Sequence, residues 1–569
     1  MGIKQDISKS VQSVTSGHDS PLHMASPVQS IESRMSDIRS AQSRIRDIDA
    51  KKVKGDENLL AEIGYKQELR RSFSTFQVFG IAYSIMGLLP SIASLTGTGL
   101  SSGPAGFLWS WFISGCFIMC LGVSMAELAS AIPTSGGLYY WTFHYAPSNY
   151  RVLISYVIGL SNSMALCSGL VSIAYGNSEE ILAAIFLSKD GDFDITTGKT
   201  YGIFAACVVS QAICTCLSSR NVALLQSVSA ISNTALIILF FIALPIGTKS
   251  NRGSFNDGSY IFGEVDNMSD WPIGFQFCLS MMTAVWTIGA FDSCVHMSEE
   301  AKNASFGVPI GIMSSISFCV VVGWCIIICT TACMSKDIAT LLDTPSGFPM
   351  AQIIKDSLGN KWAVAFMSLM AVCQWLMGSS ILTALSRQVW AFARDDGLPF
   401  ASFVKVVNKK LRVPIRAVLF STCVALLIGC LCLAGSAAST ALFSLAVSGN
   451  YVSWCTPVFL RLTSGKKIFK PGAFFLGHRW SQINGWITVA WGIYIIVLSM
   501  FPSSETVDKT TMNYTVVISC GVWILSAVYF LVYKYKFYHG PKANISQDES
   551  DSLADSAEEI PMNIDGKVE

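Results

Sequence analysis

The stretch AVWTIGAFDSCVHMSEEAKN, Ala284–Asn303, begins as an apolar run typical of a membrane span and ends in charged residues. Gly289 stands in its first half and is followed by Asp292, His296 and Glu299. Ionisable groups inside a bilayer are costly, so they usually face a cavity or a partner. The stretch therefore predicts a membrane helix that is interrupted where its polar residues begin.

The composition of the whole chain is that of a membrane protein. Its 569 residues are 51% hydrophobic and only 14% charged, with a mean hydropathy of +0.48. A soluble protein of this size would carry more surface charge, and a net charge of +1 without a basic domain excludes a nucleic-acid role. The 18 cysteines lack the spacing of a zinc site, and there is no nucleophile–base constellation or phosphate loop. We therefore expect a polytopic membrane protein that is not an enzyme and holds no metal or cofactor.

Twelve segments are long and apolar enough to span a bilayer, whose core of roughly 30 Å needs about 20 residues of helix. Only helices satisfy the backbone in lipid at these lengths, so the predicted class is all-α. The third segment ends at Ala174 or continues to Leu187. The twelve are Phe73–Leu95, Phe107–Ile132, Val152–Ala174, Tyr201–Leu217, Leu224–Gly247, Ile273–Val295, Pro309–Met334, Trp362–Phe392, Ala417–Leu433, Ala441–Leu462, Ile483–Phe501 and Tyr514–Tyr533.

Polar tails flank this region. We expect a disordered cytoplasmic tail over residues 1–70, with a short amphipathic helix near Ile31–Ile48, a transporter domain over 71–538 and a cytoplasmic tail over 539–569. Lysines and arginines concentrate in the loops after the eighth and tenth segments, which predicts that those loops and both termini are cytoplasmic. These residues are Arg394, Lys405, Lys409, Lys410, Arg412, Arg416, Lys466, Lys467, Lys470 and Arg479.

Two of the predicted helices carry an interruption. The first contains YSIMGLLP, with Gly87 at mid-depth and Pro90 shortly after, and the sixth contains Gly289. Either glycine alone is better explained by close helix packing. Interruptions at matching places in two halves indicate a transporter site built from inverted repeats, where exposed backbone N–H groups suit a carboxylate.

Asp292, His296 and Glu299 have the spacing i, i+4 and i+7, so they share one helix face. Glu299 and Glu300 are also compatible with a helix end that leaves the lipid. Asp292, close to the break, has two alternative roles. It either exchanges a proton during transport, or it stays ionised and binds the substrate amine or caps the lower half-helix.

Three stretches resemble a known family. SMAELASAIPTSGGLYYW (Ser124–Trp141) is similar to the second-helix signature of the amino acid–polyamine–organocation permeases. WTIGAFDSCVHMSEEAKNASFGVPIGI and SRQVWAFARDDGLP (Ser386–Pro399) resemble the sixth- and eighth-helix signatures of its amino acid/choline branch. The match runs from about Ala61 to Tyr538, and within that branch the chain looks like the fungal GABA permeases.

The resemblance implies a LeuT-like five-plus-five inverted repeat with two extra helices, and uptake of a small amine-bearing substrate by alternating access. It implies gate or coupling roles for Glu127, Asp292, His296, Glu299 and Arg387. It places substrate contacts at Ser84, Ile85, Met86, Gly87, Asn162, Trp286, Thr287, Ile288, Gly289, Phe291 and Asp292.

The chain also departs from the family pattern. The first helix has SIMG where bacterial relatives have a Gly-Ser-Gly type, which puts the contacts there in doubt. The fifth segment has no lysine to replace a sodium ion, so a proton carrier must lie elsewhere.

The substrate and the coupling ion stay open. GABA or a similar zwitterion with proton co-transport is the leading hypothesis, and a polyamine or choline carrier of the same fold is the second. Glu179 and Glu180, at the outer end of the third segment, either attract cations or mark an exposed helix end. A nutrient sensor is a third hypothesis. The plasma membrane is the expected location, with the vacuolar membrane as the alternative.

Overall fold

The computed structural model describes residues 60, 61, 65, 67–434, 436–508 and 512–542, without the side chains of 434–441. The predicted amphipathic helix near Ile31–Ile48 lies outside these residues. In the described part of the chain every extended element is a helix, and the β-pairing is a single isolated bridge between Phe73 and Ala301. The all-α class is confirmed there.

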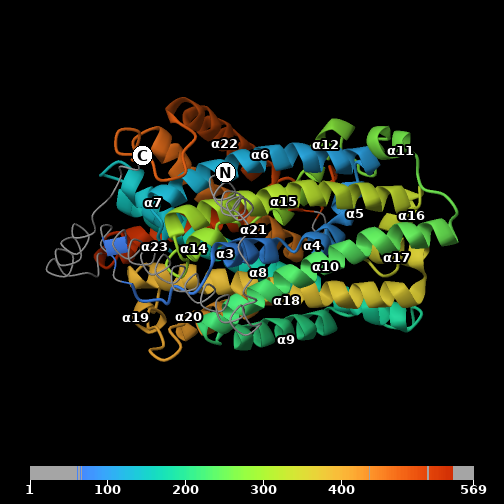
Figure 1. Ribbon diagram of the computed structural model, residues 1–569, viewed down its shortest axis with the longest axis horizontal. Coiled ribbons are helices and arrows are strands. Elements are labelled where there is room, and N and C mark those ends of the chain that lie inside the picture. The colour runs from blue at the N-terminus through green and yellow to red at the C-terminus, as the bar shows by residue number, and fades with distance from the viewer. Residues whose placement is uncertain (1–59, 62–64, 66, 435, 509–511, 543–569) are drawn as a thin grey trace, which may run out of the picture. The chain divides into compact units, whose positions relative to one another are not determined.

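Long helices lie side by side in one bundle, with their axes mostly along the horizontal of Figure 1. They are α6 (Gly103–Ala131), α8 (Arg151–Ser188), α9 (Thr197–Thr215), α10 (Ser219–Asn251), α15 (Ala304–Cys333), α18 (Asn360–Arg394), α20 (Ile415–Gly429), α21 (Ser436–Leu462), α22 (His478–Leu498) and α23 (Thr515–Val532).

Shorter helices join or interrupt them. They are α3 (Thr75–Met86), α4 (Leu88–Ser94), α5 (Thr96–Leu100), α7 (Gly137–Tyr145), α11 (Gly258–Gly263), α12 (Ile273–Ser280), α13 (Met282–Thr287), α14 (Ser293–His296), α16 (Ile338–Leu342), α17 (Pro349–Leu358), α19 (Ala401–Val404) and the 3₁₀ turns η1 (Cys430–Ala434) and η2 (Lys534–Lys536).

Within the described residues, nine helices are long and apolar enough to cross a membrane. The other three predicted spans coincide with α9, with α21 and with the run from α12 to α14. The third predicted span takes its longer form, because α8 continues to Ser188.

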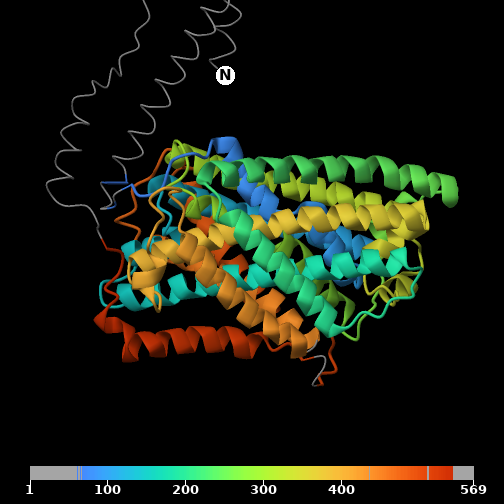
Figure 2. The same ribbon diagram turned by 90° about the horizontal axis from the view of Figure 1, so that it is seen from below.

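The outward faces of the peripheral helices are apolar. On α10 these side chains recur at helical spacing along one face, and α10 and α23 lie at opposite edges of the bundle in Figure 2. A row of large exposed apolar groups suits lipid better than water. On α10 the row is Leu224, Val228, Ile231, Ile238, Ile242 and Ile246.

The first predicted span is broken where its sequence indicates. Ser74 and Gln77 form a capping box at the start of α3, which ends at Met86. Gly87 then takes a left-handed conformation, with φ of 40°, and α4 follows. Glycine adopts this conformation without the steric cost that other residues incur. The predicted break at Gly87 is confirmed.

The sixth predicted span is broken as well. Helix α13 ends at Thr287, and α14 begins only at Ser293. The left-handed residue in the gap is Ala290, with φ of 54°, and not Gly289. The predicted interruption is confirmed, with its strained position one residue later than the glycine.

Small residues bring the central helices together. A Cβ atom on Gly169 of α8 would lie 2.8 Å from Ile381 of α18, and one on Gly159 would lie 2.6 Å from Phe392. Close approach at small residues is the usual means of helix packing in membranes. Helices α8 and α18 therefore form a tight seam beside the broken segments.

Candidate functional site

A cavity of about 40 Å³ lies where the broken segments meet α8, α18 and α21. Its size corresponds to a few water molecules. The wall consists of Ile85, Gly169, Ile173, Val285, Trp286, Thr287, Gly289, Ala290, Met377, Ile381, Ala446, Val447, Asn450, Tyr451 and Trp454.

The cavity wall contains buried polar atoms that have no partner. The Thr287 hydroxyl, the Tyr451 hydroxyl and the Trp454 indole N–H make no hydrogen bond, and each of these residues is about 1% exposed. Buried polar groups in native proteins are nearly always hydrogen-bonded. The wall therefore offers unused hydrogen-bonding capacity to a polar ligand.

The unwound backbone between α13 and α14 adds further donors. Among the backbone hydrogen bonds of the described residues, none is donated by the N–H groups of Gly289, Ala290, Phe291 or Asp292. A Cβ on Gly289 would lie 3.0 Å from the carbonyl oxygen of Trp286, so the glycine keeps this stretch narrow. Free N–H groups in a row form a place for an anionic group.

Aromatic pairs flank the cavity. The Trp286 and Phe443 rings lie 5.3 Å apart, and the Phe291 and Trp454 rings lie 4.5 Å apart. Tyr451 also contacts Trp454, at 5.2 Å. Phe291 thus stacks on a wall residue without lining the cavity itself, and movement of these rings would enlarge the space.

Asp292 lies directly after the gap and is fully buried. Its Oδ2 atom accepts a hydrogen bond of 3.0 Å from Asn162 of α8 and lies 3.4 Å from Nε2 of His296. Asp292 occupies the N-cap position of α14, but its side chain makes no capping bond. Of the alternatives set out above, the capping role therefore lacks its hydrogen bond, and Oδ1 of Asp292 has no partner.

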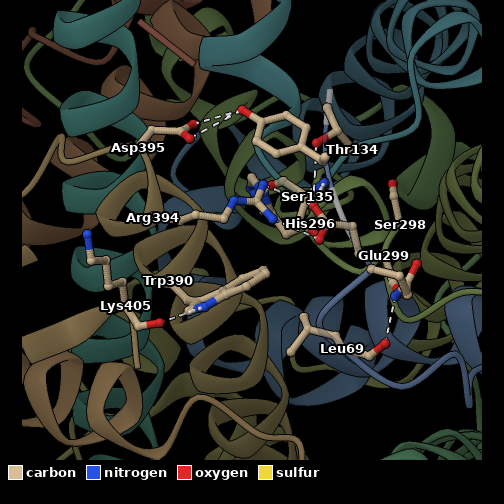
Figure 3. A network of polar contacts seen from close by, with 12 residues as sticks. Leu69, Thr134, Ser135, His296, Ser298, Glu299, Trp390, Arg394, Asp395 and Lys405 are labelled. Atoms are coloured by element: carbon tan, nitrogen blue, oxygen red, sulfur yellow. Dashed lines mark hydrogen bonds and ion pairs between the residues drawn. The ribbon is translucent and has the colours of Figure 1, made fainter. Parts of the chain in front are cut away.

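Glu299 is held by α18, on the side of the bundle where the basic loops lie. Arg394 donates two hydrogen bonds to its carboxylate, of 3.0 and 3.2 Å. The Thr134 hydroxyl and the Ser135 backbone N–H also donate to it, at 3.4 and 3.2 Å. Figure 3 shows Arg394 extending towards these groups, and Ser135 in turn contacts the His296 ring through its carbonyl oxygen.

Two further ion pairs are buried in the bundle. Arg387 donates to Glu300 at 2.8 Å, with both side chains fully buried. Arg461 of α21 donates to Glu127 of α6 at 2.5 Å, and Ser481 donates to the same carboxylate at 2.6 Å.

Glu127, Glu299 and Arg387, to which the family resemblance assigns gate or coupling roles, form no ion pair with one another. Each of the three has a different partner, because the arginine that reaches Glu299 is Arg394 and the one that reaches Glu127 is Arg461. The sequence placed Arg394 among the loop bases of the positive-inside pattern and did not single out Arg461.

Both ends of the described chain contact Asp395, which follows the last residue of α18. The Tyr65 hydroxyl donates to the Asp395 carboxylate at 3.0 Å, Tyr139 donates at 2.7 Å and the Lys542 backbone N–H at 3.2 Å. Burial raises the pKa of Asp395, although Arg394 and these hydrogen bonds oppose the rise.

Part of the predicted tail is therefore packed against the domain. Tyr65 and Leu69, which the sequence analysis assigned to the N-terminal tail, are both buried. Arg71 also donates to the carbonyl oxygens of Ser298 and Ala301.

The predicted substrate residues divide between the cavity and its surroundings. Ser84 faces away from it, because its hydroxyl contacts those of Ser229 and Ser380. Ile85, Trp286, Thr287 and Gly289 line the cavity, whereas Ser84, Met86, Gly87, Asn162, Ile288, Phe291 and Asp292 do not. The wall residues from α8, α18 and α21 were missed, since small and apolar residues in a membrane span carry no distinguishing signal.

A family model described as amino acid permease matches residues 73–524. The chain belongs to the amino acid permease family. It is 56% identical over 532 residues to the GABA-specific permease of Saccharomyces cerevisiae, with 93% of each chain covered. It is 31% identical to an uncharacterized amino-acid permease of Schizosaccharomyces pombe, in an alignment that covers 91% of this chain and 95% of the relative. It is 29% identical to a putative polyamine transporter of Candida albicans, which covers 90% of this chain and 94% of that one.

Family and structure together define the class of this permease. It is an integral, multi-pass membrane transporter, and it is not an enzyme. The cavity between the two broken segments is the candidate place where it holds its substrate.

Proposed function

We propose that this permease carries GABA or a closely similar small amino acid across the membrane by alternating access, coupled to protons. The name of the Saccharomyces cerevisiae relative, which is 56% identical, supports the substrate class. The proposal includes twelve spans with a five-plus-five inverted repeat, both termini in the cytoplasm and a place in the plasma membrane. The basic loops and the two matching helix breaks support that arrangement.

The observation that carries the substrate proposal is the set of unpartnered polar atoms around the cavity. The free N–H groups of residues 289–292 suit a substrate carboxylate. The unpaired Oδ1 atom of Asp292, below them, offers an acceptor for an ammonium group, while the hydroxyl of Tyr451 serves either end. A zwitterion with separated charges fits such a division of donors and acceptors.

The small volume of the cavity indicates a closed arrangement. A space of about 40 Å³ is too small for a molecule of the size of GABA. The rings of Trp286 and Trp454 therefore have to move before the substrate enters. Transport by alternating access requires such a rearrangement.

A polyamine is the second candidate substrate, because of the Candida albicans relative. A polycation is best held by several carboxylates, yet none of the residues that line the cavity is acidic, and Asp292 beside it supplies a single carboxylate. The wall composition therefore favours a zwitterion over a polyamine. A sensor that hardly transports is the remaining alternative, and uptake measurements decide it.

The test is uptake of radiolabelled GABA by cells that lack their own carriers, with unlabelled putrescine and choline as competitors. GABA uptake should saturate and resist both competitors. Tyr451→Phe removes only the unpartnered hydroxyl, so it should raise KM severalfold at normal surface expression. Tyr529→Phe, on the partly exposed face of α23, is the matched control. Uptake of putrescine without GABA, or no uptake at all, would refute the proposed function.

A further inference from the structure

Glu180 lies inside α8 and is fully buried, and neither of its carboxylate oxygens has a hydrogen-bond partner. The sequence interpretation of Glu179 and Glu180 as an exposed helix end is wrong, because α8 continues to Ser188; Glu179 is exposed and Glu180 is buried. The two adjacent residues point in different directions on the helix, because successive residues lie about 100° apart. Glu180 therefore needs an explanation that its neighbour does not.

The other acids of the transmembrane bundle discussed above have partners. Glu127, Glu299 and Glu300 each contact an arginine, and Asp292 contacts Asn162 and His296. Among the described residues, no lysine, arginine or histidine forms an ion pair with Glu180. It is the unpaired carboxyl group of this set.

Two amide side chains on the same stretch of the α8 and α18 seam also have an unpaired oxygen. Asn177 lies one turn away on α8, and its Oδ1 atom has no partner. Gln374 of α18 donates to the Ile173 carbonyl oxygen at 3.3 Å, and its own Oε1 atom is also unpaired. A Cβ on Gly176 would lie 3.1 Å from Gln374, so α18 is pressed against α8 one turn below Glu180.

The titratable groups around Glu180 provide no positive charge. Glu179 lies on its own helix, and from α18 the thiol of Cys373 interacts with Glu180. From α9 the thiol of Cys207 accepts a hydrogen bond of 3.4 Å from Asn177, one turn from Glu180. An ionised carboxylate without a partner is strongly disfavoured in such a place, so the group holds a proton instead.

Glu180 is connected to the substrate cavity along the seam of α8 and α18. Ile173, seven residues earlier on α8, lines the cavity, which places Glu180 about 10 Å further along the helix. On α18 the cavity residue Met377 lies one turn from Cys373. A substrate that separates the two helices at the cavity would therefore also alter the environment of Glu180.

We propose that Glu180 is the proton site that couples uptake to the proton gradient. A proton from external water bonds to the carboxylate when α8 and α18 separate, and the O–H bond persists in the closed arrangement. When the cavity opens to the cytoplasm, water reaches the group, the O–H bond breaks and the proton leaves to that water. This inference rests on the proposed function and adds its coupling residue.

The test uses the full-length protein in liposomes, with GABA uptake and the internal pH measured together. A pH step of two units supports roughly 100-fold accumulation for one proton per substrate. Glu180→Gln keeps the shape and the neutral state of the protonated acid. The variant should not accumulate GABA above the external concentration, and no protons should enter with it. It should still exchange labelled for unlabelled GABA when the pH is equal on both sides. Glu179→Gln is the matched control and should behave as the wild type.

Each other outcome overturns the inference. Accumulation by Glu180→Gln with normal proton entry would move the coupling site elsewhere. Loss of exchange as well would make Glu180 part of the substrate site or of the fold. Wild-type accumulation driven by a sodium gradient at equal pH would replace the proton by that cation. If the wild-type protein takes up no GABA, it is the proposed function that fails, which is a distinguishable result.

Discussion

Replacing Arg394 by alanine should open the cytoplasmic side of this permease. The substitution removes both hydrogen bonds from the guanidinium to Glu299, of 3.0 and 3.2 Å, and leaves that carboxylate fully buried. Removing one partner of a buried ion pair costs about 3–5 kcal/mol. Glu299 keeps the donors on Thr134 and Ser135, so we expect the lower end of this range.

The cost falls on the closed state alone. Once the cytoplasmic side opens, water solvates the carboxylate, whether or not the arginine is present. A difference of about 3 kcal/mol changes the ratio of open to closed molecules by roughly 100-fold. Arg394→Ala should therefore increase the open population by about that factor, up to saturation.

The native thiol of Cys294 reports the change. It is fully buried and donates to the Val78 carbonyl oxygen at 3.3 Å, between α14 and α3. A membrane-impermeant maleimide applied to inside-out vesicles should label it slowly in the wild type and roughly 100-fold faster in Arg394→Ala. Peptide mass spectrometry separates this cysteine from the others.

Two controls make the result decisive. The double variant Arg394→Ala with Glu299→Gln removes both charges, so its labelling rate should return close to that of the wild type. Lys410→Ala removes an exposed positive charge from the same cytoplasmic face and should change nothing. Wild-type labelling in Arg394→Ala, or a double variant that labels as fast as the single one, would refute the reasoning.

Three further predictions follow from the same contacts. Gly87→Ala forces a side chain into left-handed backbone at a cost of about 1–2 kcal/mol, so it should lower Tm and uptake, whereas Gly202→Ala in open helical surface should lower neither. Arg387→Ala should also accelerate labelling of the Cys294 thiol, and the added substitution Glu300→Gln should return the rate to that of the wild type. An unchanged rate in Arg387→Ala would mean that this arginine acts only as a positive-inside anchor. Burial alone would raise the pKa of Asp396, but hydrogen bonds from two lysines hold it below its ordinary value. Its contribution to anchoring the C-terminal segment is therefore present at neutral pH and is lost as the pH falls below about 4, which limited proteolysis across a pH series measures; a flat cleavage profile would contradict it.

The breaks in the two helices could be predicted from the sequence because their cause is local. Gly87 near Pro90, and Gly289 before a run of polar residues, disturb a helix wherever it packs. The conformational detail was not predictable, since the left-handed residue in the second break is Ala290. Which residue absorbs the strain depends on the helices packed around the gap.

The ion pairs could not be predicted because their partners are distant in sequence. Glu127 and Arg461 are separated by 334 positions, and Glu299 and Arg394 by 95. The sequence identified acids at the ends of spans and bases in loops, but several pairings were equally compatible with it. The burial of Glu180 is similar, because α8 has to continue past Ala174 and pack on α18 before the carboxyl group loses its water.

The contrast between the two sets of buried acids has a consequence for how the permease switches. At the end of the bundle that carries the basic loops, Glu127, Glu299 and Glu300 are each paired with an arginine. When this side opens, water replaces the arginine contacts of the three carboxylates. A closed state held by ion pairs can therefore open at a low net cost in free energy. Glu180 has no such partner, and its closed state therefore depends on a proton. Without the proton, the carrier would be hindered from closing over the cavity. This hindrance would prevent the carrier from transporting its substrate without a proton.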